Sequence, residues 1–119
     1  GYPMRVAELL STLEGPAYIE RASLGNVKAI LQAKKAIRRA IECQMEGKGF
    51  SLVELLSPCP TIWKLDPVAA QKRVHDEMER YFKPGVTCDR RATRPGLQEA
   101  APPPPLAEIP SILNLPAEE

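Results

Sequence analysis

The fold of this chain is decided by one stretch, Phe50-Ser51-Leu52-Val53-Glu54-Leu55-Leu56-Ser57-Pro58-Cys59-Pro60-Thr61. Its first seven residues predict a short buried strand, because they are largely apolar and are bounded by Gly49 and Pro58. Pro58 has no amide donor and therefore ends the strand, while Pro60 keeps Cys59 out of the helical region. We expect one thiol to be held rigidly just beyond the C-terminal end of a strand, where ligands of open α/β sheets bind.

The segments before this strand predict a βαβ unit. Residues 17–22 favour a strand, and Asn26 is a suitable N-cap for a long helix over residues 27–46. A strand, an amphipathic helix and an apolar strand in this order indicate a parallel pair joined by a right-handed crossover. The helix has an apolar stripe at intervals of three and four residues that we expect to face the sheet: Ile30, Ala33, Ile37, Ala40, Ile41 and Met45.

Two further helices are expected on either side of this unit. Pro3 suits the first turn of a short amphipathic helix of about three turns, which ends at Gly15-Pro16. Asp66-Pro67 combines an N-cap with a proline at the first helical position, and it predicts a helix that runs to about residue 81. The inward face of that second helix is predicted to consist of Val68, Val74, Met78 and Tyr81 or Phe82.

The composition divides the chain into a folded portion, residues 1–94, and a tail, residues 95–119. The tail contains seven of the 13 prolines, so it favours polyproline II or disorder over a packed structure. The folded portion has the size of at most one domain. Because the chain opens with Gly1-Tyr2-Pro3, we expect it to be a trimmed product or a portion of a longer polypeptide.

Charge and cysteine usage exclude several classes of protein. The formal net charge is +1, which gives no global attraction to nucleic acid or to an anionic membrane. No apolar run approaches the roughly 20 residues that a membrane span needs, and no secretory signal is visible. Three cysteines at irregular spacing do not form a disulfide framework, so a reducing, cytoplasmic setting is favoured.

Few residues are candidates for chemistry. From the local sequence, Cys59 is either an inert packed thiol or a metal or redox ligand. Cys43 is expected to pack beside the helical stripe, and Cys88 to be exposed in the polar stretch 87–91. Neither forms a Cys-x-x-Cys pair with Cys59, so the chain alone has no complete metal site. His75 has no Ser, Cys or Asp placed in sequence to make it a catalytic base, and we assign no catalytic residue.

One face of the long helix is basic. Its cations are Lys28, Lys34, Lys35, Arg38 and Arg39. Such a face is solvated surface or a contact for an acidic partner. Nucleic acid is disfavoured, because no aromatic residues are interleaved and no nucleic-acid-binding module is present.

Several stretches together resemble one protein family. They are Gly1 to Glu8, Ala17 to Arg21, Gly49 to Glu54, Ser57 to Thr61, Trp63 and Asp66-Pro67. In this order they resemble the C-terminal part of the thiamine-diphosphate-binding beta subunit of 2-oxoacid:ferredoxin oxidoreductases. The motif Ser57-Pro58-Cys59-Pro60-Thr61 is the most specific of these pieces, and the resemblance covers about residues 1 to 90.

The resemblance implies an α/β fold with parallel strands and crossover helices, the C-terminal portion of a thiamine-diphosphate-binding domain. It implies oxidative decarboxylation of a 2-oxo acid to acyl-coenzyme A, with electrons passed to ferredoxin. The implied partners are the alpha and further (gamma or delta) subunits of the enzyme. Pyruvate, 2-oxoglutarate and branched-chain 2-oxo acids all remain open as substrates.

Carried over by residue, the resemblance makes Cys59 the fourth ligand of a [4Fe–4S] cluster whose other cysteines lie upstream. The family's Gly-Asp-Gly motif for the diphosphate and Mg²⁺ would also lie upstream of Gly1. No residue of this chain is therefore expected to bind thiamine diphosphate, and the chain is expected to be inactive alone. The alternative function is a small α/β interaction module that docks on a partner through its basic helix or its proline-rich tail.

Overall fold

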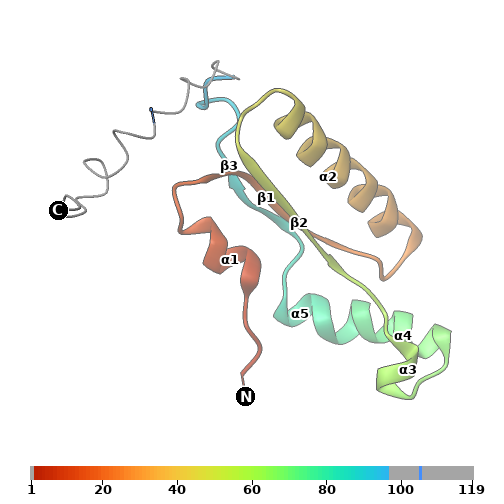
Figure 1. Cartoon of the computed structure of the whole chain (residues 1–119). Helices are drawn as coiled ribbons and strands as arrows, with labels where there is room; N and C mark the ends of the chain where they lie inside the picture. The colour runs from red at the N-terminus through yellow and green to blue at the C-terminus, as the bar shows by residue number, and fades with distance from the viewer. Residues whose placement is uncertain (1, 97–104, 106–119) are drawn as a thin grey trace.

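The computed structural model describes residues 2–96 and 105. The proposed tail from residue 95 onward therefore lies almost wholly outside the described residues. The centre of the fold is a three-stranded sheet in the order β2 (Phe50–Leu56), β1 (Pro16–Ser23) and β3 (Gly85–Asp89) (Figure 1). Helix α2 (Val27–Met45) covers one face of this sheet. Helix α1 (Val6–Ser11) and the segment from α4 (Pro67–Arg73) to α5 (Glu79–Tyr81) lie on the other face (Figure 1). Among the described residues, no helix is long and apolar enough to span a membrane.

The βαβ unit is confirmed. β1 (Pro16–Ser23), α2 (Val27–Met45) and β2 (Phe50–Leu56) follow one another, and the two strands are parallel. The Asn26 side chain accepts a hydrogen bond from the backbone amide of Ala29 at 2.9 Å, as expected of an N-cap. At the other end, Gly47 adopts a φ of 65°, a left-handed conformation that suits glycine and lets the chain turn toward β2.

The predicted inward stripe of α2 is wrong in part. The residues that α2 buries are small: Ala33, Ala36, Ala40 and Cys43. Ile37 and Ile41 remain 40% and 54% exposed. Alanines let the helix approach the sheet closely, so the helix presents its alanine face and turns the larger isoleucines toward its side. The spacing of apolar residues along the sequence does not by itself show whether the alanine face or the neighbouring isoleucine side of the helix packs on the sheet.

A third strand, β3 (Gly85–Asp89), was not predicted. It pairs antiparallel with β1, so the sheet is mixed and not purely parallel as expected. Its sequence is short and largely polar, and it alternates with a period of two only through Val86 and Cys88. The strand lies at an edge of the sheet, where it pairs with a single neighbouring strand, and it buries only one side chain. Its sequence therefore needs no strong apolar pattern.

The helices near the two ends differ from expectation in length and regularity. α1 spans only Val6–Ser11, and Pro3 lies outside it. An additional helical turn, α3 (Pro60–Trp63), precedes α4 (Pro67–Arg73). α4 continues through a π-helical turn, η1 (Val74–Met78), into α5 (Glu79–Tyr81), so the predicted helix to residue 81 is present with one irregularity.

The inward face of this helical run is only partly as predicted. Val74 is fully buried, whereas Val68, which was predicted to face inward, is largely exposed. Ala70 is the buried residue in the first turns instead. Val68 lies in the first turn of α4, two residues after the capping Asp66.

Candidate functional site

The candidate site begins at the end of β2, where Cys59 follows Leu56 after two residues. Cys59 is partly exposed and has φ −126° and ψ 79°, outside the helical region as its position before a proline requires. Pro60 is the first residue of α3, and the backbone amide of Trp63 donates to the Cys59 carbonyl at 3.1 Å. The thiol is therefore carried by a backbone that two prolines and a helical turn hold in place.

Cys59 supplies a single donor to any metal group. Its thiol is free. Within residues 2–96 and 105, no three His, Cys, Asp or Glu side chains come together in a way that would hold a metal ion. A [4Fe–4S] cluster is held by four cysteine thiolates, so Cys59 can supply only one of the four ligands.

The other two cysteines pack against β1. Cys43 lies between α2 and the sheet with Ala17 and Tyr18, and desolvation raises the pKa of its thiol. Cys88 packs with Ala7 and Ile19 on the opposite face and is only 7% exposed. The expectation that Cys88 is exposed is therefore wrong, because β3 directs alternate side chains into the sheet face that α1 covers.

His75 belongs to a structural contact. Its Nδ1 lies 3.1 Å from Glu79 Oε2 on the same helical run, and the ring is mostly exposed. The other oxygen of Glu79 accepts a hydrogen bond from the Ser23 hydroxyl, which itself accepts from the Gly25 amide at 3.0 Å. Because Glu79 stands between the histidine and the serine, this arrangement does not activate the serine. It ties the helical run to the loop that follows β1.

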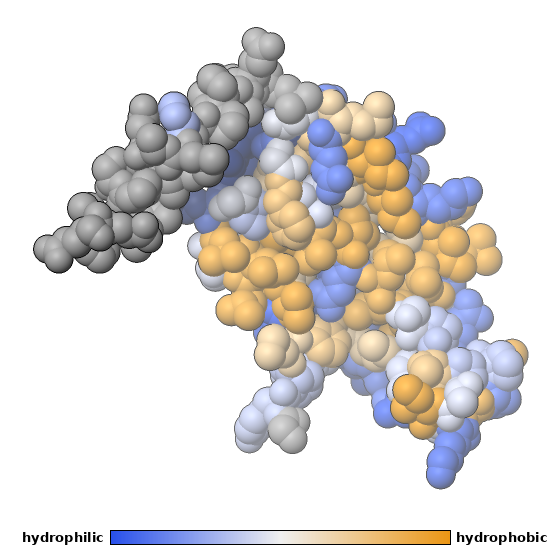
Figure 2. Space-filling view, in the orientation of Figure 1, coloured by the Kyte–Doolittle hydropathy of each residue, from blue (hydrophilic) through white to orange (hydrophobic). Residues whose placement is uncertain are grey.

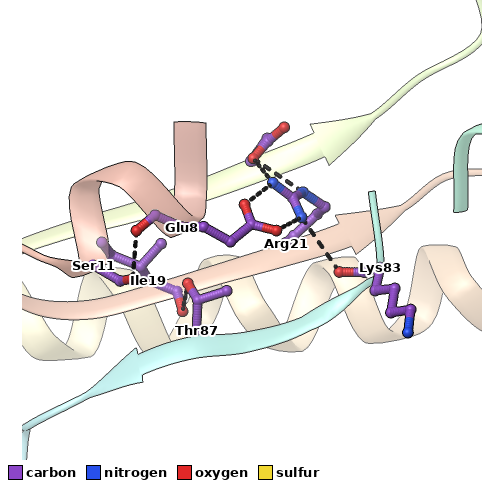
Figure 3. A network of polar contacts seen from close by, with 7 residues as sticks. Glu8, Ser11, Ile19, Arg21, Lys83 and Thr87 are labelled. Carbon is purple, nitrogen blue, oxygen red and sulfur yellow. Dashed lines mark hydrogen bonds and ion pairs between the residues drawn. The ribbon is translucent and has the colours of Figure 1, made fainter. Parts of the chain in front are cut away.

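The strongest electrostatic feature is the buried guanidinium of Arg21 (Figure 3). It donates to Glu8 at 2.6 and 2.7 Å and to Glu54 at 2.9 and 3.1 Å. The hydrogen bonds to Arg21 lower the pKa of Glu8 from 4.5 to about 2. The Phe82 ring lies against the guanidinium, with its centroid 5.3 Å from the central carbon. This cluster joins α1, both parallel strands and the end of α5.

A second polar group lies on the α2 face of β1. The Tyr18 hydroxyl donates to the Glu20 carboxylate, which also accepts from Arg39 at 3.0 and 3.2 Å. Burial and the neighbouring Glu20 both raise the pKa of Tyr18. The phenol therefore remains protonated, and the group fixes α2 on the sheet.

A cavity of about 340 Å³ lies beside the carboxyl end of β1. Residues from β1, the first turns of α2, α5 and the start of β3 line it, including Ser23, Lys28, Gln32, Glu79 and Gly85. Its charged groups have both signs. It lies toward the end of the sheet at which the parallel strands have their carboxyl ends, and Cys59 follows β2 at that same end.

Sequence reasoning missed the Arg21 cluster. The signal was present, since Arg21 and Glu54 are opposite charges inside two strands that were predicted to be neighbours, and Glu54 is the only charged residue of the second strand. The observed register places these two residues directly opposite each other. A search for the register that pairs the two charges would have found this contact, although not the contribution of Glu8.

The chain is similar to two ketoisovalerate oxidoreductase subunits, both named VorA. The subunit from Methanothermobacter marburgensis is 49% identical over 82 residues, which are 69% of this chain and 17% of that protein. The subunit from Methanothermobacter thermautotrophicus is 46% identical over 92 residues, which are 77% of this chain and 19% of that protein. No family model and no solved structure matches the chain.

This chain therefore spans less than a fifth of the length of the curated relatives it matches. It is a partial homologue of these oxidoreductase subunits. The resemblance drawn from the sequence is confirmed in part, because the relatives are named as subunits of an oxidoreductase of ketoisovalerate, which is a 2-oxo acid. The assignment to a beta subunit and to a thiamine-diphosphate-binding domain stays a prediction.

Proposed function

We propose that this chain is part of the beta subunit of a 2-oxoacid:ferredoxin oxidoreductase and forms the C-terminal portion of its thiamine-diphosphate-binding domain. The observation that carries the proposal is the identity of 46% to 49% with ketoisovalerate oxidoreductase subunits over most of the described residues. The parallel β1-α2-β2 unit, with the Cys59 loop at the carboxyl end of β2, is compatible with such a domain.

The substrate class follows from the names of the relatives. Ketoisovalerate is a branched-chain 2-oxo acid, so we propose that the complete enzyme oxidises branched-chain 2-oxo acids to the corresponding acyl-coenzyme A. Ferredoxin is the proposed electron acceptor, and the other subunits of the enzyme are the proposed partners. Pyruvate and 2-oxoglutarate, which the sequence left open, become the competing substrates of the assay.

The role that we propose for Cys59 is that of one ligand of a [4Fe–4S] cluster. When bound, such a cluster accepts and passes on single electrons. Cys59 contributes a thiolate whose position the flanking prolines and α3 restrict, and the apolar end of β2 limits water on one side. The other three ligands must come from outside the described residues, because Cys43 and Cys88 pack against β1.

We assign no residue of this chain to thiamine diphosphate or its Mg²⁺. The decarboxylation chemistry belongs to that cofactor, and the protein supplies binding and orientation. What the described residues contribute is a scaffold: the Arg21 cluster fixes β1 against β2, and the loops after both strands are tied by the Leu24 amide, which donates to the Leu56 carbonyl at 2.9 Å. This contact holds the start of the Cys59 loop.

The test is the Cys59→Ser variant of the complete enzyme, with Cys43→Ala and Cys88→Ala as matched controls. We expect Cys59→Ser to lower the iron content, alter the electron paramagnetic resonance signal of the reduced enzyme, and slow ketoisovalerate-dependent reduction of ferredoxin. Both controls should keep full iron and an unaltered signal. Full iron and normal ferredoxin reduction in Cys59→Ser would return Cys59 to a packing role.

The function itself has a separate readout. The complete enzyme should reduce ferredoxin or a viologen dye with ketoisovalerate and coenzyme A, and faster than with pyruvate or 2-oxoglutarate at equal concentration. Absence of activity with all three 2-oxo acids would contradict the proposed function, whatever the state of Cys59.

A further inference from the structure

We propose that the open edge of β2 is an internal interface, on which a further strand of the same polypeptide, apolar on both faces, pairs and extends the sheet. The inference rests on the proposed function, in which this chain is one portion of a longer subunit. It concerns assembly rather than catalysis, so its test uses the backbone of β2 and not the activity.

The two edges of the sheet are built differently. β3, at one edge, is five residues long, ends at Asp89, and has a register irregularity opposite Ile19 and Glu20. These features protect an edge strand from further pairing. β2, at the other edge, has seven residues without proline or lysine, and its one charge, Glu54, is engaged by Arg21. It lacks the usual protection of a solvent-exposed edge.

The backbone direction of β2 also shows which of its N–H and C=O groups point away from β1. The Leu56 carbonyl accepts from the Leu24 amide, so it points toward β1. Since successive residues in a strand direct their backbone groups to opposite sides, those of Ser51, Val53 and Leu55 point to the open edge. No other strand among the described residues pairs with them.

Apolar side chains overhang this edge from the α2 face. Gln44 of α2 donates to the Ser51 hydroxyl of β2 at 2.9 Å, so this side of the helix lies over β2. Ile37 and Ile41 precede Gln44 by seven and three residues and therefore share its side. Both are exposed, as is Leu55 of β2. The residues that the helix does not bury against the sheet thus line the space beside the open strand.

The opposite face is apolar at the same edge. Phe50 of β2 is 52% exposed, and Leu52 is only partly covered by the cluster that α1 forms with the sheet. Figure 2 shows apolar side chains gathered in a broad band over α1 and the sheet. An added strand would be covered by isoleucines on one side and by Phe50 and Leu52 on the other.

These flanks define the chemistry of the occupant. A strand with one polar face would bury that face against the α2 isoleucines or against Phe50, so the occupant must be apolar on both faces. The relatives have more than four-fifths of their length beyond the matched part, which is ample sequence for such a strand. The same polypeptide is therefore the occupant that the observations favour over a second copy.

The first experiment measures amide hydrogen exchange in the complete subunit. We expect the amides of Ser51, Val53 and Leu55 to exchange at least about 100-fold more slowly than in an unstructured peptide. A photo-crosslinking amino acid at Leu55 should form an intramolecular crosslink to a segment outside residues 1–119. Rapid exchange of the three amides would overturn the proposal, as would crosslinks to residues 97–119 or to a second copy.

The second experiment uses a matched pair of substitutions on α2. Ile41 and Leu31 are both 54% exposed, but they lie about 80° apart around the helix, and only Ile41 is on the β2 side. In the complete subunit, Ile41→Glu should speed exchange of the three β2 amides by about tenfold or more, while Leu31→Glu leaves it within about twofold. Equal effects of the two variants would overturn the proposal.

The outcomes separate this inference from the proposed function. An enzyme that oxidises ketoisovalerate but exchanges the β2 amides rapidly keeps its function and loses the interface. An inactive subunit with protected amides keeps the interface and loses the function. Neither result depends on the iron content.

Discussion

Arg21 shows how one side chain can join separate segments of the chain. Its guanidinium is buried and is shared between Glu8 of α1 and Glu54 of β2, with a longer contact of 3.5 Å to the Lys83 carbonyl after α5. The planar fork of arginine can donate to two carboxylates at once, which a lysine ammonium cannot match in geometry. The position of α1 on the sheet therefore depends on a polar contact as well as on Ala7 and Leu10.

Replacing Arg21 with methionine should be strongly destabilising. Methionine fills a similar volume but cannot donate to Glu8 and Glu54. The two neighbouring carboxylates then lack their donor and repel each other. Loss of one member of a fully buried charge pair costs about 3–5 kcal/mol, and we expect the lower end of this range or somewhat less here, because Glu8 and Glu54 are partly exposed to solvent. Urea denaturation of Arg21→Met beside the unaltered protein measures this loss, and Arg21→Lys should fall between the two. A loss below about 1 kcal/mol for Arg21→Met would show that the cluster is not a determinant of stability.

The pH dependence of stability should reveal Glu8. Arg21 lowers the pKa of this carboxyl in the folded chain from 4.5 to about 2. The stabilisation is therefore complete above pH 4.5 and is lost as the pH falls from 4.5 toward 2. In Glu8→Gln, the midpoint of thermal unfolding should be lower at neutral pH and should change less between pH 5 and 2. Solvent reaches Glu8 and screens its interaction with Arg21, so we expect the difference to be small. Equal pH profiles of the two proteins would contradict the prediction.

At the level of elements, the helix that follows the Cys59 loop begins at a residue that the sequence identified correctly. The Asp66 carboxylate accepts from the Val68 and Ala69 amides at 3.0 and 3.1 Å, and Pro67 occupies the first helical position. This signal is entirely local, because a cap and a proline act within one turn of the helix. That locality explains why the sequence predicted it.

Removal of this cap should have a moderate effect. Asp66→Ala leaves two amides of the first turn without the carboxylate, which costs about 0.5–2 kcal/mol. Thermal unfolding of Asp66→Ala and Asp66→Asn distinguishes the cap from the charge, since asparagine caps nearly as well. Coincident melting curves for all three proteins would mean that this helix start does not contribute to stability.

Nonlocal features were predicted less well. The strand β2 and the helix α2 were found because each has a strong pattern of its own. The choice between the alanine face and the isoleucine side of α2 depends on how closely the helix packs on the sheet and on what covers its outer side. β3 depends on pairing with β1, and five residues with one buried side chain carry too little pattern to predict it. Cys59 was placed correctly at a strand end, while its role as a ligand depends on residues elsewhere.

At the scale of the whole molecule, the first and last elements of the described chain, α1 and β3, both contact β1. β3 pairs with β1, and α1 packs on both strands, so the first and last elements form one contact region (Figure 1). Arg90, just after β3, closes this region. Its guanidinium donates to the backbone carbonyls of Leu13 and Pro16 at 2.7 and 3.1 Å and to that of Ser11 at 3.2 Å.

Arg90→Ala should therefore loosen α1 from the sheet more than it alters the sheet itself. The three carbonyls belong to the last residue of α1, the turn and the first residue of β1. Hydrogen bonds from a charged donor contribute about 1.5–3 kcal/mol, and solvent reduces this here because the bond to Leu13 is exposed and the other two are only partly buried. We expect a loss of roughly 1–2 kcal/mol, with faster amide exchange in residues 6–13 and unchanged exchange in β2. Arg38→Ala, at an exposed position on α2, is the control and should change neither quantity. Uniformly faster exchange over the whole sheet in Arg90→Ala would show instead that β3, not α1, depends on this arginine.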